Sequence, residues 1–207
     1  MNASKLILWK DVDGIKQLNP RWGIETPTIP YLGYGQAAEL SMHGTPVIHP
    51  ATVYPLIQEG IPIEIKNFHN RNSQVSTIIG PDIETDEIIA IGCQPGVAII
   101  TGNKPLSSDL LLEIERFGII PWLMKSTPEG FKIILPKHDL HHLEKIIPGK
   151  IEFKTAIISI IGKPDIGIEH ELISTNEYGT RIIVETDQLH ETIRELYHSL
   201  FSRQDCK

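Results

Sequence analysis

The sequence predicts an α/β fold in two parts, and three features of the chain lead to this prediction. In the first 80 residues, short apolar runs typical of strands alternate with segments typical of helices. In the remainder, a hairpin followed by a helix occurs twice with similar spacing. Between the two parts, Gly80 to Glu87 is acidic and has the composition of a linker. We therefore place a boundary near residues 80–88.

The composition is that of an ordinary globular protein. The chain has 207 residues, of which 41% are hydrophobic and 22% charged, so it can form one large domain or two small ones. A formal net charge of −7 argues against a nucleic-acid partner, which would require a basic face. Two cysteines and the absence of a signal peptide or a membrane-length apolar run favour a cytoplasmic protein without a membrane partner.

The first strand and the first helix are expected before residue 44. The apolar run Leu6 to Trp9 predicts a buried strand, which opens into a loop at Lys10 to Gly14. The segment Tyr34 to Met42 is typical of a helix, and Gly44 follows it. This order, strand then loop then helix, is that of an α/β unit.

The stretch Gly44 to Asn67 predicts a turn, a short helix and a strand. A helix can begin at Pro50, because the N–H that proline lacks is not needed there. It contains Pro55, which argues against a long regular helix, and Gly60 can end it in the left-handed conformation. The strand is indicated by isoleucines that alternate with other residues: Ile61, Ile63 and Ile65.

Two ordered motifs in this part resemble signatures of the aspartate kinases, which belong to the amino-acid kinase superfamily. The first is W-K-D-V-D-G-I-K-Q-L-N-P-R at residues 9–21. The second is G-T-P-V-I-H-P at residues 44–50, followed by G-I-P-I-E-I-K-N at residues 60–67. The resemblance covers roughly residues 5–80. It implies that residues 1–82 are a partial, carbamate-kinase-like kinase domain, the remnant of its ATP lobe.

The resemblance also locates the family's ATP wall in this sequence. Its positions are Lys10, Asp11, Lys16, Arg21, Pro46 and Val47. Lysine replaces a threonine at position 10 and a tyrosine at position 16, and Pro46 replaces a lysine and offers a phosphate neither charge nor donor. We therefore expect a folded lobe that does not bind ATP. The alternative is measurable affinity, with Lys10 and Lys16 supplying charge and Mg²⁺ bound only together with ATP.

We expect no catalytic residue in this chain. The family's Lys-Phe-Gly-Gly phosphate cradle lies in an N-terminal half to which nothing in this sequence corresponds. Phosphoryl transfer depends on positioning and on neutralising charge around the transferred group. A chain without the half that holds the acceptor should not catalyse the reaction by itself.

The second part, residues 88–207, contains the repeat. In the first copy, the hairpin strands are Trp122–Thr127 and Phe131–Leu135, and a helix starts at Asp139. In the second copy, the hairpin strands are Leu172–Thr175 and Arg181–Val184, and a helix starts at Asp187. Upstream of the first hairpin, Val97 to Thr101 predicts a strand and Ser107 to Phe117 a helix, and Ile151 to Phe153 can close the unit. The last helix has an apolar stripe of Leu189, Ile193, Leu196, Leu200 and Phe201.

This order of elements is similar to that of an ACT domain, a ferredoxin-like α+β module that aspartate kinases carry in tandem. We divide the region into units at about 88–150 and 151–207. The second unit is abridged, because only Gly162 to His170 separates its first strand, Ala156 to Ile161, from the next.

The resemblance implies an effector site where the first strand of an ACT unit meets its first helix. The corresponding residues are Thr101, Gly102, Asn103, Ser107 and Ile120. Ile120 stands where the family has an asparagine, and it cannot make that residue's hydrogen bonds. Two alternatives remain: the units bind an amino acid, or they only dimerise. We interpret His138, Asp139, His141 and His142 as a helix start with solvated histidines rather than a metal site.

Three functions are compatible with the resemblance. The first is a regulatory or assembly chain of aspartate-family amino-acid biosynthesis, without independent catalysis. The second is the C-terminal part of a functional aspartate kinase, which converts ATP and L-aspartate to 4-phospho-L-aspartate and needs an N-terminal partner. The third is a freestanding amino-acid-binding ACT module. The expected partner is a second copy, joined through the ACT units, or a full-length aspartate kinase chain.

Overall fold

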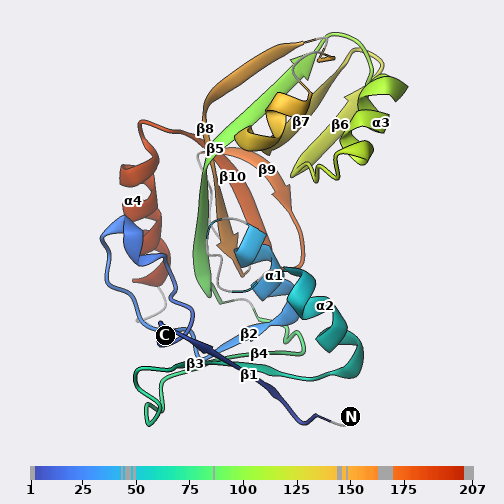
Figure 1. Cartoon of the computed structure of the whole chain (residues 1–207). Helices are drawn as coiled ribbons and strands as arrows, with labels where there is room; N and C mark the ends of the chain where they lie inside the picture. Colours follow the sequence, from blue (N-terminus) through green and yellow to red (C-terminus); the bar gives the residue numbers. More distant parts are fainter. Residues whose placement is uncertain are drawn as a thin grey trace. The chain divides into compact units, whose positions relative to one another are not determined.

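The computed structural model describes residues 3–42, 44, 48, 50–85, 87–143, 146–147, 149–162 and 170–202 (Figure 1). The elements in chain order are β1 (Leu6–Lys10), η1 (Pro20–Trp22), β2 (Tyr31–Gly33), α1 (Tyr34–Met42), α2 (Pro50–Glu59), β3 (Ile63–Asn67), β4 (Thr77–Gly80), β5 (Ala90–Gly102), α3 (Ser108–Arg116), β6 (Leu123–Thr127), β7 (Gly130–Pro136), η2 (Lys137–His142), β8 (Lys150–Ile161), β9 (Glu171–Thr175), β10 (Gly179–Glu185) and α4 (Leu189–Phe201), where η marks a 3-10 helix. No helix in these ranges is long and apolar enough to cross a membrane.

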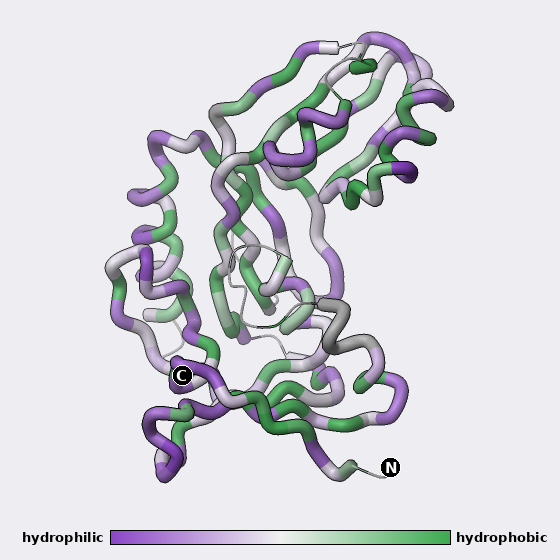
Figure 2. The backbone as a smooth tube through the Cα atoms, in the orientation of Figure 1, coloured by the Kyte–Doolittle hydropathy of each residue, from purple (hydrophilic) through white to green (hydrophobic). Residues whose placement is uncertain are grey.

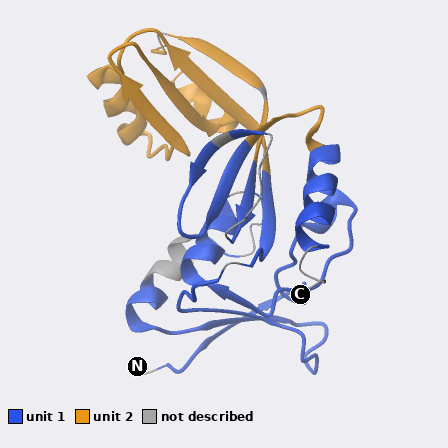
Figure 3. Ribbon diagram, turned by 180° about the vertical axis from the view of Figure 1, so that it is seen from behind, with its two compact units in different colours: residues 1–93, 158–182, 190–207 blue, residues 94–157, 183–189 orange. Residues whose placement is uncertain are grey.

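The chain divides into two compact units, neither of which is continuous in sequence (Figure 3). Unit 1 consists of residues 1–93, 158–182 and 190–207, and unit 2 of residues 94–157 and 183–189. Strands β5, β8 and β10 therefore each begin in one unit and end in the other. The domain boundary near residues 80–88 stays a prediction.

A four-stranded mixed sheet forms the first part of unit 1. Its strand order is β1-β3-β4-β2, with β1 parallel to β3, β2 parallel to β4, and β3 antiparallel to β4. On one face, Ile63, Ile65 and Ile79 are fully buried together with Leu40 of α1. The alternation of isoleucines that predicted β3 therefore reflects one face packed on this core.

Strand β1 confirms the predicted strand but not its full burial. Leu6 and Leu8 pack against the core, whereas Ile7 and Trp9 are 37% and 47% exposed. Successive side chains of a strand point to opposite faces, so a sheet covered on one face leaves every second residue exposed. A run of four apolar residues does not distinguish these two cases.

The helices of this part begin and end where the sequence predicts. Helix α1 spans Tyr34–Met42, and α2 begins at Pro50 and contains Pro55. After α2, Gly60 adopts φ 62° and donates its N–H to the carbonyl of Ile57. This is the left-handed C-terminal cap that glycine permits.

The described strands of unit 2 have the order of a ferredoxin-like fold. Strand β7 pairs antiparallel with β5 and β6, and the sheet runs β6-β7-β5-β8. Helix α3 packs Leu110 and Ile114 against a core that includes Ile100 and Ile133. Apolar and hydrophilic residues alternate along α3 in Figure 2, as expected for a helix that covers a sheet on one side. This confirms the predicted ACT-like architecture.

One detail of this unit differs from the prediction. Instead of an α-helix that Asp139 caps, the chain forms the 3-10 helix η2, whose N-cap is Pro136 without a capping side chain. Pro136, the last residue of β7, has φ −57°, and the turn begins three residues earlier than an aspartate cap would place it.

The second ferredoxin-like unit lies in unit 1 and is closed by a strand that precedes it in sequence. Strands β9, β10 and the end of β8 are neighbours, and Ile89, just before β5, donates its N–H to the carbonyl of Ile161 at 2.9 Å. Helix α4 buries Ile193 and Leu200, which confirms the predicted apolar stripe. Residues 163–169, where a first helix would lie, are outside the described residues.

Candidate functional site

The loop after β1 carries the first predicted ATP-wall residues. Lys10 ends the strand and Asp11 follows it, and both are exposed. Thr77 of β4 holds this loop in place. Its hydroxyl accepts the N–H of Ile15 at 2.8 Å and donates to the carbonyl of Ile29 at 2.7 Å. Thr77 is fully buried, so these bonds form without competition from water.

The two kinase-like motifs contact each other at the ends of β1 and β3. The amide of Asn67, the last residue of the second motif, donates to the carboxylate of Asp13 in the first motif at 2.9 Å. Lys16 is half-buried and forms an isolated bridge with Thr28. The bond between Asn67 and Asp13 gives both side chains a structural role, because it holds the loop in which Lys10 and Asp11 are exposed.

Arg21 is held by the backbone of the same unit. Its guanidinium donates to the carbonyl of Cys93 at 2.7 Å, and the amide of Asn19 donates to the carbonyl of Gly44 at 3.1 Å. Gly44 has φ 101°, and a Cβ there would lie 1.8 Å from the carbonyl oxygen of Cys93. The structure thus brings together Arg21 of the first motif and Gly44 of the second.

Four of the six predicted wall residues are therefore placed, all in unit 1: Lys10, Asp11, Lys16 and Arg21. Pro46 and Val47 lie outside the described residues. Arg21 has five N–H donors, and one of them donates to the carbonyl of Cys93. That these residues form an ATP wall stays a prediction.

The predicted effector loop lines an open depression of about 520 Å³ in unit 2. Its lining residues are Thr101, Gly102, Asn103, Gly149 and Lys150. Three glycines allow the chain segments to approach closely here. A Cβ on Gly102 would lie 2.2 Å from the ring of Phe131, one on Gly130 2.3 Å from the carbonyl of Gly102, and one on Gly149 2.2 Å from the carbonyl of Thr101. The depression is therefore lined largely by backbone.

The other two predicted effector residues do not line this depression. The hydroxyl of Ser107 accepts the N–H of Leu110 at 3.3 Å and so caps α3. Ile120 follows α3 and is 67% exposed. Their assignment to an effector site stays a prediction.

Sequence reasoning missed Gly149 and Lys150. Lys150 is exposed and pairs with Glu152 at 2.8 Å, and this hydrogen bond raises the pKa of the Lys150 ammonium. The available signal was the predicted closing strand at Ile151 to Phe153, since the outer strand of a ferredoxin-like sheet lies beside the first one.

The histidine-rich segment shows ring contacts rather than a ligand cluster. The rings of His141 and His142 are 3.7 Å apart between centroids, and His142 stacks on Phe117 at 4.4 Å. Within the ranges that the structure describes, no three His, Cys, Asp or Glu residues gather to hold a metal ion.

Comparison with known proteins identifies the relationship. Residues 1–67 match the family model described as the amino acid kinase family. The bifunctional aspartokinase/homoserine dehydrogenase of Haemophilus influenzae is 41% identical over 80 residues, which are 39% of this chain and 10% of that protein. The chain is related to the aspartate kinases. Aspartokinase 3 of Arabidopsis thaliana is 23% identical over an alignment that covers 100% of this chain and 44% of that protein.

Solved aspartate kinases have the same fold over nearly the whole chain. The Clostridium acetobutylicum enzyme matches 97% of this chain with 54% of its own, at a TM-score of 0.76 and 19% identity. Escherichia coli aspartokinase III, solved in complex with aspartate and ADP, matches 96% of this chain with 53% of its own, at a TM-score of 0.76 and 18% identity. The resemblance inferred from the motifs is thus confirmed, and the chain spans about half or less of these relatives.

Proposed function

We propose that this chain is an aspartate-kinase-related regulatory or assembly chain of aspartate-family amino-acid biosynthesis, and that residues 1–207 do not catalyse phosphoryl transfer by themselves. The observation that carries the proposal is the depression at Thr101 to Asn103, which lies at the strand-to-helix corner of a ferredoxin-like unit. The altered wall positions Lys10 and Lys16 support the second half of the proposal.

The depression suits a small zwitterion. The side-chain amide of Asn103, which lines the depression, can both donate and accept hydrogen bonds. Lys150 supplies a cation for a carboxylate, although its ammonium is shared with Glu152. We therefore expect a free amino acid as effector, with lysine, threonine and methionine as the first to test.

Exposed apolar side chains in unit 2 support association with a second copy or with an aspartate kinase chain. They lie on α3, directly after it, and on β6: Leu111, Leu112, Phe117, Ile120 and Met124, each between 40% and 67% exposed. Monomeric proteins rarely expose many large apolar groups close together.

A second candidate is the C-terminal part of a functional kinase. Lys10 and Asp11 are exposed at the end of β1, and Arg21 is also exposed. These groups could face ATP and Mg²⁺ if an N-terminal half supplied the aspartate site. In this case the chain takes part in transfer of the γ-phosphoryl group of ATP to L-aspartate.

A thermal-shift panel distinguishes the candidates. A ligand at about 100 times its Kd adds about 2.7 kcal/mol to the free energy of unfolding, which raises Tm by about 5–10 °C for a chain of this size. We expect such a shift with one of the three amino acids and not with Mg-ATP. Lys150→Ala should abolish it, whereas Lys125→Ala, an exposed lysine of β6, should not.

Other results of this panel would change the conclusion. A shift with Mg-ATP alone would favour the functional kinase half. A shift with an amino acid, but a monomer at all concentrations in light scattering, would favour a freestanding sensor. No shift with any ligand, together with a stable dimer, would leave only the assembly role.

A further inference from the structure

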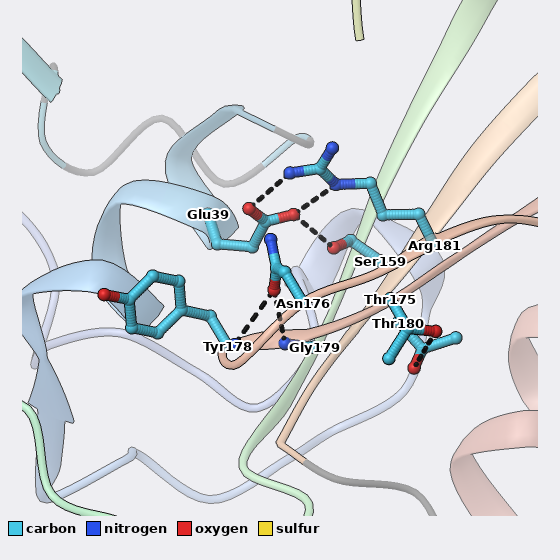
Figure 4. A network of polar contacts seen from close by, with 8 residues as sticks. All are labelled: Glu39, Ser159, Thr175, Asn176, Tyr178, Gly179, Thr180 and Arg181. Carbon is cyan, nitrogen blue, oxygen red and sulfur yellow. Dashed lines mark hydrogen bonds and ion pairs between the residues drawn. The ribbon is translucent and has the colours of Figure 1, made fainter. Parts of the chain in front are cut away.

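Helix α1 is tied to strand β10 by a buried ion pair (Figure 4). Arg181 of β10 donates from Nε and Nη2 to the two carboxylate oxygens of Glu39, the second bond being 2.5 Å long. The hydroxyl of Ser159 on β8 also donates to this carboxylate, at 3.3 Å. The side chains of Glu39 and Arg181 are only 6% and 15% exposed, so removing either one would leave the other charge buried without this partner.

The first turn of α1 contacts the β9–β10 hairpin a second time. A Cβ on Gly35 would lie 2.1 Å from the ring of Tyr178, so only glycine allows the ring to pack on this turn. The hairpin turn itself is fixed, because the side chain of Asn176 accepts the N–H groups of Tyr178 and Gly179 at 2.9 and 3.0 Å (Figure 4). Asp82 of the linker accepts the N–H of Gly35 at 2.9 Å.

The other end of α1 leads to Arg21. The helix ends at Met42, and Gly44, two residues later, packs on the carbonyl of Cys93 and accepts the amide of Asn19. Arg21 binds the same carbonyl of Cys93. One helix of nine residues therefore contacts the β9–β10 hairpin along its first two turns and precedes the anchor point of Arg21.

We infer that α1 couples the β9–β10 hairpin to the Arg21 region, with the Glu39–Arg181 pair as the principal link. A displacement of the hairpin moves α1, because the buried pair and the Tyr178 ring do not allow the two to slide independently. Movement of α1 then displaces Gly44 and with it the contacts that hold Asn19 and Arg21. The functional meaning of this coupling rests on the proposed function, but the coupling itself does not.

Hydrogen exchange of the full chain without ligand tests the coupling. We expect Glu39→Gln and Arg181→Met each to speed exchange about tenfold or more in residues 34–42 and in residues 21–23, whose N–H groups donate to Asn19 and Pro20. The double variant should be no faster than the faster single variant, since both lose the same pair. The control Arg116→Met removes an exposed pair with Glu113 in unit 2 and should change neither segment.

Two results would overturn the inference. One is faster exchange confined to residues 34–42 and 176–182, with residues 21–23 unchanged. The other is an equal increase throughout unit 1, including β1 and β3, which would mean a general loss of stability. If the charge variants do not fold, Tyr178→Ala can be used instead, because it removes only the ring contact. It should speed exchange in the same segments, but by a smaller factor. Because no ligand is present, failure here leaves the effector proposal untouched.

Discussion

At the scale of single residues, glycines at close approaches carry much of the local structure. Gly44 and Gly60 both have positive φ, 101° and 62°. They differ in their surroundings, because a Cβ would collide with the Cys93 carbonyl at Gly44 and would meet nothing within 4 Å at Gly60. Comparing alanine substitutions at Gly44 and Gly60 therefore separates the cost of a steric clash from the cost of placing a side chain at positive φ.

We expect Gly44→Ala to lower the free energy of unfolding by about 3 kcal/mol or more, and Gly60→Ala by about 1 kcal/mol. Only the first variant adds a backbone clash to the cost of a left-handed alanine. Urea denaturation measures both values. Equal losses in the two variants would show that Gly44 does not pack on Cys93.

The Cys93 thiol gives a prediction about pH. Burial raises its pKa to about 12, against an ordinary value of 9.0. The unfolded chain therefore loses the thiol proton first, and stability is lost as pH rises from about 9 towards 12. The variant Cys206→Ala keeps the buried thiol, whereas Cys93→Ala removes it. Between about pH 9 and 12, the free energy of unfolding of Cys206→Ala should fall with pH more steeply than that of Cys93→Ala, by up to about 1.4 kcal/mol per pH unit. Parallel curves would contradict the burial of the thiol.

At the scale of elements, Thr77 of β4 connects the loop after β1 to the segment before β2. Its hydroxyl serves both the N–H of Ile15 and the carbonyl of Ile29. We expect Thr77→Val, which keeps the shape, to cost about 2–4 kcal/mol because it leaves two buried backbone groups unpaired. Thr192→Val, at a buried position of α4, is the matched control and should cost less than 1 kcal/mol. A similar cost at both positions would contradict the role of the hydroxyl.

The elements show how far sequence reasoning extends. Local signals were sufficient for α1, for the α2 cap at Gly60 and for the α4 stripe, because period, proline and glycine act within a few residues. They could not show that Ile7 and Trp9 are exposed, since burial depends on which sheet face is covered. The Glu39–Arg181 pair joins residues 142 positions apart and left no local signal, because a charged residue in a helix usually faces solvent.

The candidate sites were predictable to different extents. The glycine-rich corner at Thr101 to Asn103 follows from the ferredoxin-like order, but Lys150 comes from the closing strand and was not expected. Ser107 was predicted as a helix start and its hydroxyl is used for that purpose. Pairing of distant strands, rather than local pattern, decided which residues line the depression.

At the scale of the whole molecule, the exposed apolar side chains of unit 2 predict self-association. We expect Leu112→Glu combined with Ile120→Glu to weaken a dimer at least tenfold, because both residues are more than 60% exposed and a charge opposes burial in an interface. Analytical ultracentrifugation measures the effect. Ile83→Glu, at a linker position 60% exposed in unit 1, is the control. A dimer unaffected by the double variant would place the interface elsewhere.

Our proposal is that residues 1–207 combine a kinase-like lobe with ferredoxin-like units and do not transfer phosphate by themselves. Hydroxylamine traps the acyl phosphate that aspartate kinases form, so the purified chain can be assayed directly with Mg-ATP and L-aspartate. We expect no hydroxamate above the background of a protein-free reaction. Hydroxamate that accumulates in proportion to the purified chain would contradict it.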